Sequence, residues 1–319
     1  MKTSKKFIFA GLTGALLALA FPPVPFYLFA FIAFVPLLFL MVNEENLKKK
    51  YLMIYLAFFI YHTGTNWWIS SWQSETDPYL MASGLALCIA HPFFFMIPFA
   101  LFSLIKKKIS TNIAIWSFPF LWTAFEFAHG LGEFSYPWLT IGNTQYYNHY
   151  WVQIIDIIGV YGASFLIALI NVLLLKLILF IRKNEIKTMK ILKFSKSRNY
   201  ILVVIALILI PNIYGFYRVF EYTHIFKARE LDVAIVQPNI NPWRKWETSV
   251  PQQIQIHKHL QDSLRKSNPY IDLALWCETS IPYMSIETNA FHDYPDIRNW
   301  VDTSNIALLT GFTELKLFD

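Results

Sequence analysis

The sequence predicts a polytopic α-helical membrane domain of about seven spans, followed by the first part of an α/β domain. The chain of 319 residues is 55% hydrophobic and only 15% charged, whereas soluble globular chains carry about 25% charged residues. Its apolar residues form long runs before residue 218 and short, separated runs after residue 230. A run of about 20 apolar residues is the length that a helix needs to cross a bilayer.

The predicted membrane domain covers residues 1–217. Each of its apolar runs is long enough, or nearly so, to cross a bilayer. The first run is short and follows three lysines, so a cleaved signal peptide is an alternative for it. The predicted spans are 7–21, 26–42, 51–70, 79–105, 111–128, 153–181 and 200–217.

The loops between these runs predict the orientation of the chain. Lys and Arg near the ends of spans remain in the cytoplasm. Every second connection is basic, as at Lys48–Lys50 and Lys106–Lys108, and the connections at 22–25, 71–78 and 129–150 contain no Lys or Arg. We therefore expect a bacterial inner-membrane protein with a cytoplasmic amino terminus and a periplasmic or extracellular carboxyl-terminal domain.

A polar connector, 218–230, leads to the predicted α/β domain at 231–319. Short apolar runs predict three buried strands, and Ser249 is placed to cap a helix between the first two. A shorter helix is expected before the third strand, and this alternation indicates parallel pairing. The strands are Val233–Val236, Leu273–Trp276 and Ile306–Leu309, and the shorter helix is Tyr294–Thr303.

The net charge of +6 does not indicate a nucleic-acid partner. From Arg218 onward there are 10 Lys and Arg against 13 Asp and Glu, so the basic excess lies in the membrane loops. Cys88 lies in a hydrophobic span, and we do not expect it to pair with Cys277. The sequence contains no metal-ligand cluster or phosphate-binding glycine loop, so no metal or cofactor is predicted.

Glu278 is the candidate acid or base. It follows the predicted strand at Leu273–Trp276, which we expect to be buried on both faces. In open α/β sheets, ligands bind beyond the carboxyl ends of the strands, where a carboxylate can exchange protons with a substrate. A solvated loop carboxylate without a chemical role is the alternative.

Four further residues are candidates for binding. Glu126 and Asp156 are ionisable residues within spans, where charge is costly, although hydrogen bonds to neighbouring helices would also explain them. Trp138 lies in an aromatic loop that either anchors the chain at the membrane interface or borders a lipid headgroup. Trp246 follows the first predicted strand and suits an acyl chain, a headgroup or merely an exposed loop.

Several motifs, in order and spacing, resemble those of the apolipoprotein N-acyltransferase family, bacterial membrane enzymes with a nitrilase-like domain outside the membrane. The resemblance covers essentially the whole chain. The motifs are Leu19–Pro23, Trp67–Ile69, Trp122–Glu126, Tyr136–Leu139, Ile158–Gly162, Asn171, Val236–Ile240, Lys245–Trp246, Trp276–Pro282 and Leu309–Phe312.

The resemblance implies an αββα nitrilase-like sandwich that moves an acyl chain from a phospholipid to the amino-terminal cysteine of an apolipoprotein. The reaction passes through a thioester on an enzyme cysteine, in membrane lipid and without a cofactor. Glu278 matches the glutamate of the family's Trp-Pro-Glu motif, which resembles a general base that activates the thiol. Trp246 matches an aromatic position near the substrate.

This sequence also departs from the family's pattern. Cys277 replaces the usual proline before Glu278, and His129 stands where the family commonly has arginine. The chain ends at Asp319, ahead of the family's lysine and nucleophilic cysteine, so the 319 residues alone are expected to lack acyltransferase activity. The alternatives are a non-catalytic relative that binds lipid or lipoprotein, and a transporter that uses Glu126 and Asp156.

Overall fold

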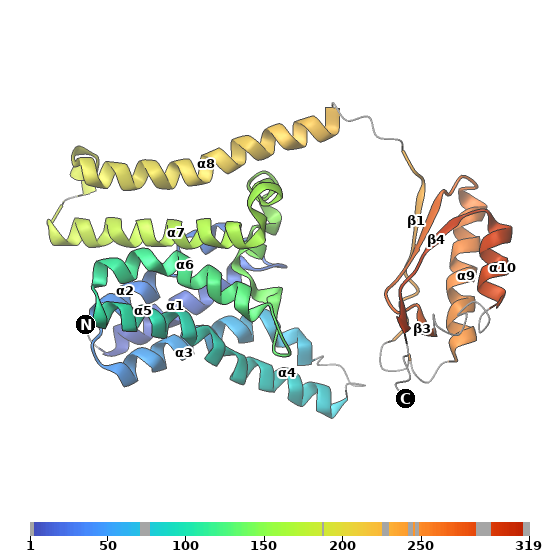
Figure 1. The fold of residues 1–319 in the computed structure, drawn as a ribbon, viewed down its shortest axis with the longest axis horizontal. Coiled ribbons are helices and arrows are strands. Elements are labelled where there is room, and N and C mark those ends of the chain that lie inside the picture. Colours follow the sequence, from blue (N-terminus) through green and yellow to red (C-terminus); the bar gives the residue numbers. More distant parts are fainter. Residues whose placement is uncertain are drawn as a thin grey trace. The chain divides into compact units, whose positions relative to one another are not determined.

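The computed structural model divides the chain into two compact units, Met1–Phe226 and Lys227–Asp319 (Figure 1). The structure describes residues 3–70, 77–186, 188–224, 230–241, 245, 249–284 and 295–314. The first unit is helical and the second contains both helices and strands.

Eight α-helices build the described part of the first unit. They are α1 (Thr3–Ala20), α2 (Val35–Asn43), α3 (Leu47–Asn66), α4 (Pro78–Ala90), α5 (Ile97–Lys108), α6 (Thr111–His129), α7 (Ile155–Lys183) and α8 (Ser195–His224). Short 3-10 helices link them: η1 (Tyr27–Phe31), η2 (Trp67–Ser70), η3 (His91–Met96), η4 (Pro137–Leu139), η5 (Ile141–Tyr147), η6 (Trp151–Ile154) and η7 (Thr188–Lys193). Because α8 runs to His224, the predicted connector from Arg218 begins within a helix.

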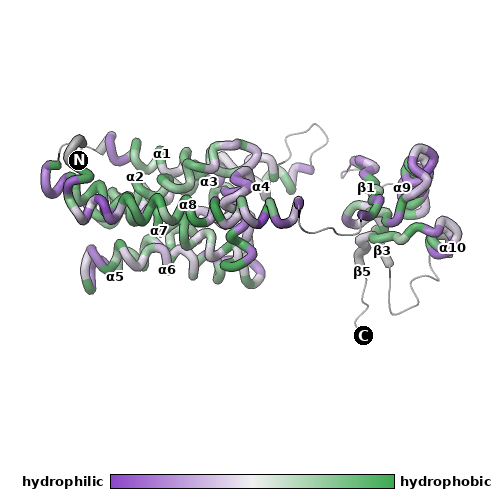
Figure 2. Tube along the Cα trace, turned by 90° about the horizontal axis from the view of Figure 1, so that it is seen from above, coloured by the Kyte–Doolittle hydropathy of each residue, from purple (hydrophilic) through white to green (hydrophobic). Residues whose placement is uncertain are grey.

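Within the described residues, three helical stretches are long and apolar enough to cross a membrane: Pro78–Lys108, Trp151–Lys183 and Ser195–His224. Hydrophobic residues run along the helices of this unit (Figure 2). Helices also occupy the other four predicted spans, but none of them is both long enough and apolar enough to be counted with these three. A helical membrane domain is therefore supported, and the number of seven spans stays a prediction.

Two of the predicted spans are interrupted by proline. The predicted span 26–42 divides into η1 and α2, with Pro36 in the first turn of α2. The predicted span 79–105 divides into α4, η3 and α5, with Pro92 in the first turn of η3. Proline lacks the N–H that a continuous α-helix needs at that position, so the helix restarts there.

Small residues allow close packing of α1 against α3. A Cβ atom added to Gly14 would lie 2.3 Å from the carbonyl oxygen of Ala57, and one added to Gly64 would lie 2.7 Å from Cβ of Ala18. Such small-residue contacts are typical of membrane helices, because they let two backbones approach closely. The buried aromatic side chains of this unit include Phe34, Phe58, Phe95, Phe99, Phe118 and Trp122.

The second unit contains a parallel sheet in the order β1-β2-β4. The strands are β1 (Val233–Val236), β2 (Leu273–Trp276) and β4 (Ala307–Leu309), so the predicted strands and their parallel pairing are confirmed. Two helices, α9 (Val250–Ser267) and α10 (Pro295–Ser304), also lie close to their predicted positions. A second parallel pair, β3 (Ile281–Met284) with β5 (Phe312–Glu314), was not expected from the sequence.

The expectation that the β2 strand is buried on both faces is wrong. Burial alternates along both strands: Ala234, Val236, Ala274 and Trp276 are buried, whereas Ile235 of β1 is 71% exposed and Leu273 and Leu275 of β2 are half-buried. Figure 1 shows α9 and α10 on the same side of this sheet. One face is therefore covered by helices, and the described residues leave the opposite face largely open.

Candidate functional site

Glu278 lies at the carboxyl edge of the parallel sheet. Strand β2 ends at Trp276, and Glu278 follows in a turn with its side chain exposed to solvent. Parallel strands place all their carboxyl ends at one edge. Residues that follow β1 and β4 therefore come to the same edge as Glu278.

Hydrogen bonds from both neighbouring strand ends fix the turn that carries Glu278. From the β1 side, Lys245 Nζ donates a 2.6 Å hydrogen bond to Thr279 Oγ1. From the β4 side, the hydroxyls of Ser280 and Thr310 share a 2.6 Å hydrogen bond. Since Thr279 adopts a positive φ of 51°, the chain turns sharply directly after Glu278. The turn thus holds the carboxylate at the edge and leaves it open to a substrate.

In the first unit, Glu126 fastens the loop that carries Trp138. Its Oε1 accepts hydrogen bonds from Trp122 Nε1 at 2.7 Å and from the backbone N–H of Ile141 at 2.8 Å. Glu126 is only 5% exposed. A buried carboxylate that receives two donors is suited to hold a loop. We see no described contact that would place Glu126 itself in a binding site.

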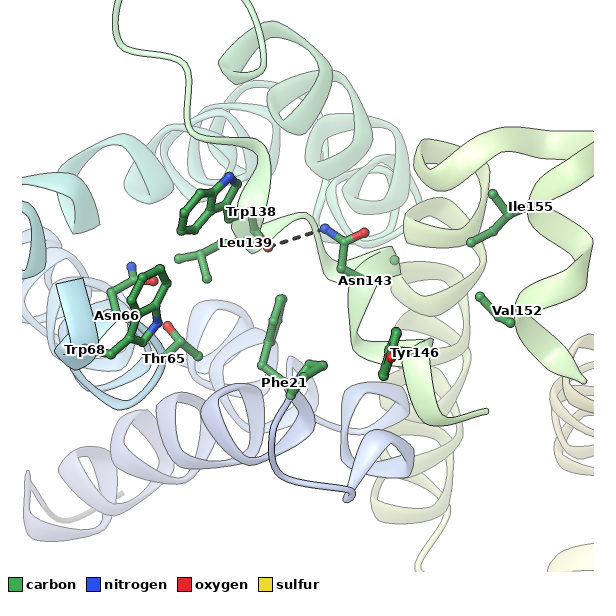
Figure 3. Close-up of a pocket in the computed structure, with 12 residues that line it drawn as sticks. Phe21, Thr65, Asn66, Trp68, Trp138, Leu139, Asn143, Tyr146, Val152 and Ile155 are labelled. Carbon is green, nitrogen blue, oxygen red and sulfur yellow. Dashed lines mark hydrogen bonds between the residues drawn. The ribbon is translucent and has the colours of Figure 1, made fainter. Parts of the chain in front are cut away.

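Trp138 borders a cavity of about 360 Å³ (Figure 3). Its ring stacks on that of Trp68, with centroids 5.3 Å apart and planes 9° from parallel. Asn143 Nδ2 donates to the Trp138 carbonyl at 3.3 Å, and Phe21 and Tyr146 also line the space. Cavities of this size and aromatic lining commonly hold small molecules or parts of lipids.

Asn66 supplies a polar group to this cavity. Its Oδ1 accepts a 3.0 Å hydrogen bond from the Tyr136 hydroxyl, whereas its Nδ2 has no hydrogen-bond partner among the described residues. A buried amide N–H without a partner carries a free-energy cost, which an acceptor on a bound molecule would remove. The cavity therefore combines aromatic walls with polar side chains, among them Asn66 and Asn143.

The remaining sequence-predicted residues do not join either site. The Tyr214 hydroxyl lies 2.8 Å from both carboxylate oxygens of Asp156, which share its proton, and Arg218 Nε donates to Asp156 at 3.2 Å. Asp156 therefore links α7 to α8. Trp246 lies outside the described residues. Since Glu126 and Asp156 both bind neighbouring groups, neither gives the transporter hypothesis an observation in its favour.

Comparison with known proteins decides the family. Residues 13–173, half of the chain, match the model of the apolipoprotein N-acyltransferase N-terminal domain. The chain belongs to the apolipoprotein N-acyltransferase family.

Relatives in this family extend the similarity beyond that domain. The apolipoprotein N-acyltransferase of Chlorobaculum tepidum is 29% identical over 317 residues, covering 98% of this chain and 56% of that protein. That of Geobacter metallireducens is 29% identical over 284 residues, covering 88% of this chain and 52% of that protein. That of Rickettsia typhi is 27% identical, covering 94% and 56%. The chain spans about half the length of these relatives.

Sequence reasoning missed several residues around both sites. Lys245 belongs to a family motif, but no local pattern indicates that its side chain reaches the turn after Glu278. Asn66 and Tyr136 meet across 70 positions of sequence, and no local pattern marks such a pair. The many aromatic residues between positions 134 and 150 were the sequence feature that pointed to the cavity.

Proposed function

We propose that this protein takes part in lipoprotein N-acylation, moving an acyl chain from a membrane phospholipid to the amino-terminal cysteine of an apolipoprotein through an enzyme thioester. In this proposal Glu278 is the general base that takes the proton of the attacking thiol. The family resemblance implies the lysine and cysteine that complete a nitrilase-like site, and we assign them to no residue of this chain.

The position of Glu278 is the observation that carries the proposal. Its carboxylate is exposed at the edge of the sheet where α/β proteins bind ligands. The ordered turn beneath it, held by Lys245 and by Ser280 with Thr310, is the kind of support that keeps a base in one place. Family membership favours this chemistry over a merely solvated carboxylate.

The cavity beside Trp138 is the proposed site for part of the phospholipid. The stacked indoles of Trp68 and Trp138 offer an apolar wall, and Asn66 and Tyr146 bring polar groups to the lining of the same space. In this arrangement Trp138 touches the lipid, and Glu126 positions Trp138 through the backbone of Ile141. Trp246 remains a candidate for contact with the substrate.

Replacing Glu278 tests the reaction. Glu278→Gln keeps the size of the side chain and removes its basicity, so acyl transfer should fall by about 100-fold or more. Transfer is measured as the mass gain of an apolipoprotein in membranes that contain the variant expressed from its natural gene. Glu230→Gln, an exposed substitution in the same unit, is the control. Activity of Glu278→Gln within a few-fold of the natural protein would rule out a general base at this position.

We also propose seven spans, with the second unit on the outer face of the inner membrane. The alternation of basic and neutral loops supports this orientation. The two free cysteines provide the test, since Cys277 is half-buried in the second unit and Cys88 is buried in the first. A membrane-impermeant maleimide should modify Cys277 in intact spheroplasts and leave Cys88 unmodified. Modification of Cys277 only after the membrane is permeabilised would reverse the orientation.

A further inference from the structure

Three histidines of the first unit form a hydrogen-bonded chain that has no role in the proposed acyl transfer. His62 lies on α3, His91 on η3 and His129 at the end of α6. His62 Nε2 and His91 Nδ1 are 3.1 Å apart, and His91 Nε2 and His129 Nε2 are also 3.1 Å apart. His62 is fully buried and His91 is 8% exposed, so these two rings hydrogen-bond to each other rather than to solvent.

The hydrogen bonds assign each proton in this chain when the three rings are neutral. His62 Nδ1 lies 2.7 Å from the Phe58 carbonyl, which can only accept, so this nitrogen carries the proton. His62 Nε2 must then accept from His91 Nδ1. By the same reasoning, His91 Nε2 accepts from His129 Nε2. The chain therefore leaves His129 Nδ1 with a lone pair, as a hydrogen-bond acceptor.

Two phenylalanines fix the plane of the His129 ring. The ring stacks on Phe125 at 5.3 Å and 11°, and on Phe94 at 5.2 Å and 27°. The bond from His129 Nε2 to His91 fixes its rotation in that plane. Among the described residues, none hydrogen-bonds His129 Nδ1. An ordered acceptor without a partner is thus held between two aromatic rings.

His129 also lines an apolar groove of about 410 Å³ along α5 and α6. The groove passes Leu101 and Leu121 at one end and reaches His129 at the other, and its other lining residues are apolar. The eight residue steps from Leu121 to His129 correspond to about 12 Å of helix. It shares no lining residue with the cavity beside Trp138.

The groove matches the polarity of a membrane lipid. Helix α5 belongs to a stretch that is apolar and long enough to cross a membrane, and Ile97 and Leu101 on its groove side are exposed. The histidine lies at the end of the groove away from Lys106–Lys108, where α5 ends. A uniformly polar ligand would lose its hydrogen bonds against these walls. An acyl chain with a polar group at one end would not.

We propose that this groove is a resident lipid site that takes one acyl chain of a phospholipid whose headgroup donates a hydrogen bond to His129 Nδ1. The site is additional to the cavity proposed for the phospholipid that is consumed, because the two spaces share no lining residue. Its chemistry is specific: the headgroup must carry an N–H or O–H, since the histidine chain presents an acceptor.

Native mass spectrometry of the delipidated full chain tests the headgroup. Phosphatidylethanolamine and phosphatidylcholine with identical acyl chains are added separately; both carry a phosphate and a cationic amine, but only the first has N–H donors. At the tightest binding site, phosphatidylethanolamine should bind with about two- to tenfold higher affinity than phosphatidylcholine. This is the difference expected from one hydrogen bond. In His129→Phe, which keeps an aromatic ring there, both lipids should bind and the preference should disappear. Equal binding of the two lipids to the natural protein would overturn the proposal.

A second variant tests the groove independently of His129. Ala124 is exposed and lines the groove, so Ala124→Phe should fill it without overpacking the core and should remove one bound lipid. Ala86→Phe, an exposed substitution on α4 that does not line the groove, is the matched control and should leave the number of bound lipids unchanged. Retention of every lipid by Ala124→Phe would show that the lipid binds elsewhere.

Discussion

The Sγ atom of Cys277 lies 3.4 Å from Nε2 of His257, where β2 ends against α9. His257 Nδ1 lies 2.7 Å from the carbonyl of Gln253 and so carries the ring proton. The Cys277 thiol must then donate to Nε2. Burial of the ring lowers the pKa of His257, as does the charge of Lys245, although the bond to Gln253 opposes this. Folding therefore favours the neutral imidazole of His257.

We predict that the second unit loses stability in mild acid because of His257. Its pKa in the folded chain is below the ordinary value of 6.5, so the unfolded chain binds more protons as the pH falls below that value. The free energy of unfolding should decrease through this window, by at most about 1.4 kcal/mol per pH unit for one group. Hydrogen exchange of the α9 amides in the full chain, corrected for the intrinsic rate, measures the loss.

A neighbouring histidine provides the control for this pH dependence. His259 lies on the same helix and is exposed, whereas His257 is fully buried. His257→Gln should flatten the pH dependence of α9 protection, and His259→Gln should leave it as it is in the natural protein. If His257→Gln kept the full dependence, another group would be responsible.

Much of the second unit's fold could be predicted from the sequence. Runs such as Val233–Val236 and Leu273–Trp276 mark strands because their apolar residues are continuous and bounded by polar segments. The same runs predicted burial on both faces, which was wrong, since both helices cover one face. Strand position is a local property of the sequence, whereas burial depends on what packs against the strand.

Gly14 is predicted to be essential for the packing of α1 against α3. In Gly14→Ala the new methyl group would meet the Ala57 carbonyl oxygen at 2.3 Å, so the helices must separate, at a cost of about 1–3 kcal/mol. Gly11→Ala is the matched control, because its nearest neighbour would be Ile60 Cδ1 at an ordinary 3.8 Å. The temperature at which the detergent-solubilised protein aggregates should fall for Gly14→Ala alone. Equal behaviour of the two variants would contradict this packing.

The candidate sites were only partly predictable. Glu278 was found because its place after a strand is a local feature. The roles of Glu126 and Asp156 could not be predicted, because their partners lie on other segments. Glu126 binds the backbone of Ile141, and Asp156 binds Tyr214 and Arg218. The cost of burying charge marks such residues as constrained, but it does not distinguish a binding group from a group that fastens a loop.

Glu126 is predicted to act by fastening the Trp138 loop. Glu126→Ala would leave the Trp122 indole and the Ile141 N–H without their acceptor, at a cost of about 1–3 kcal/mol, and would release the loop. Chymotrypsin should then cut within 130–150 at least several-fold faster. Glu126→Gln retains an oxygen acceptor of the same reach and should be affected less, and Glu133→Ala, an exposed change in the same loop, should behave as the natural protein. Unchanged cleavage of Glu126→Ala would mean that other contacts hold the loop.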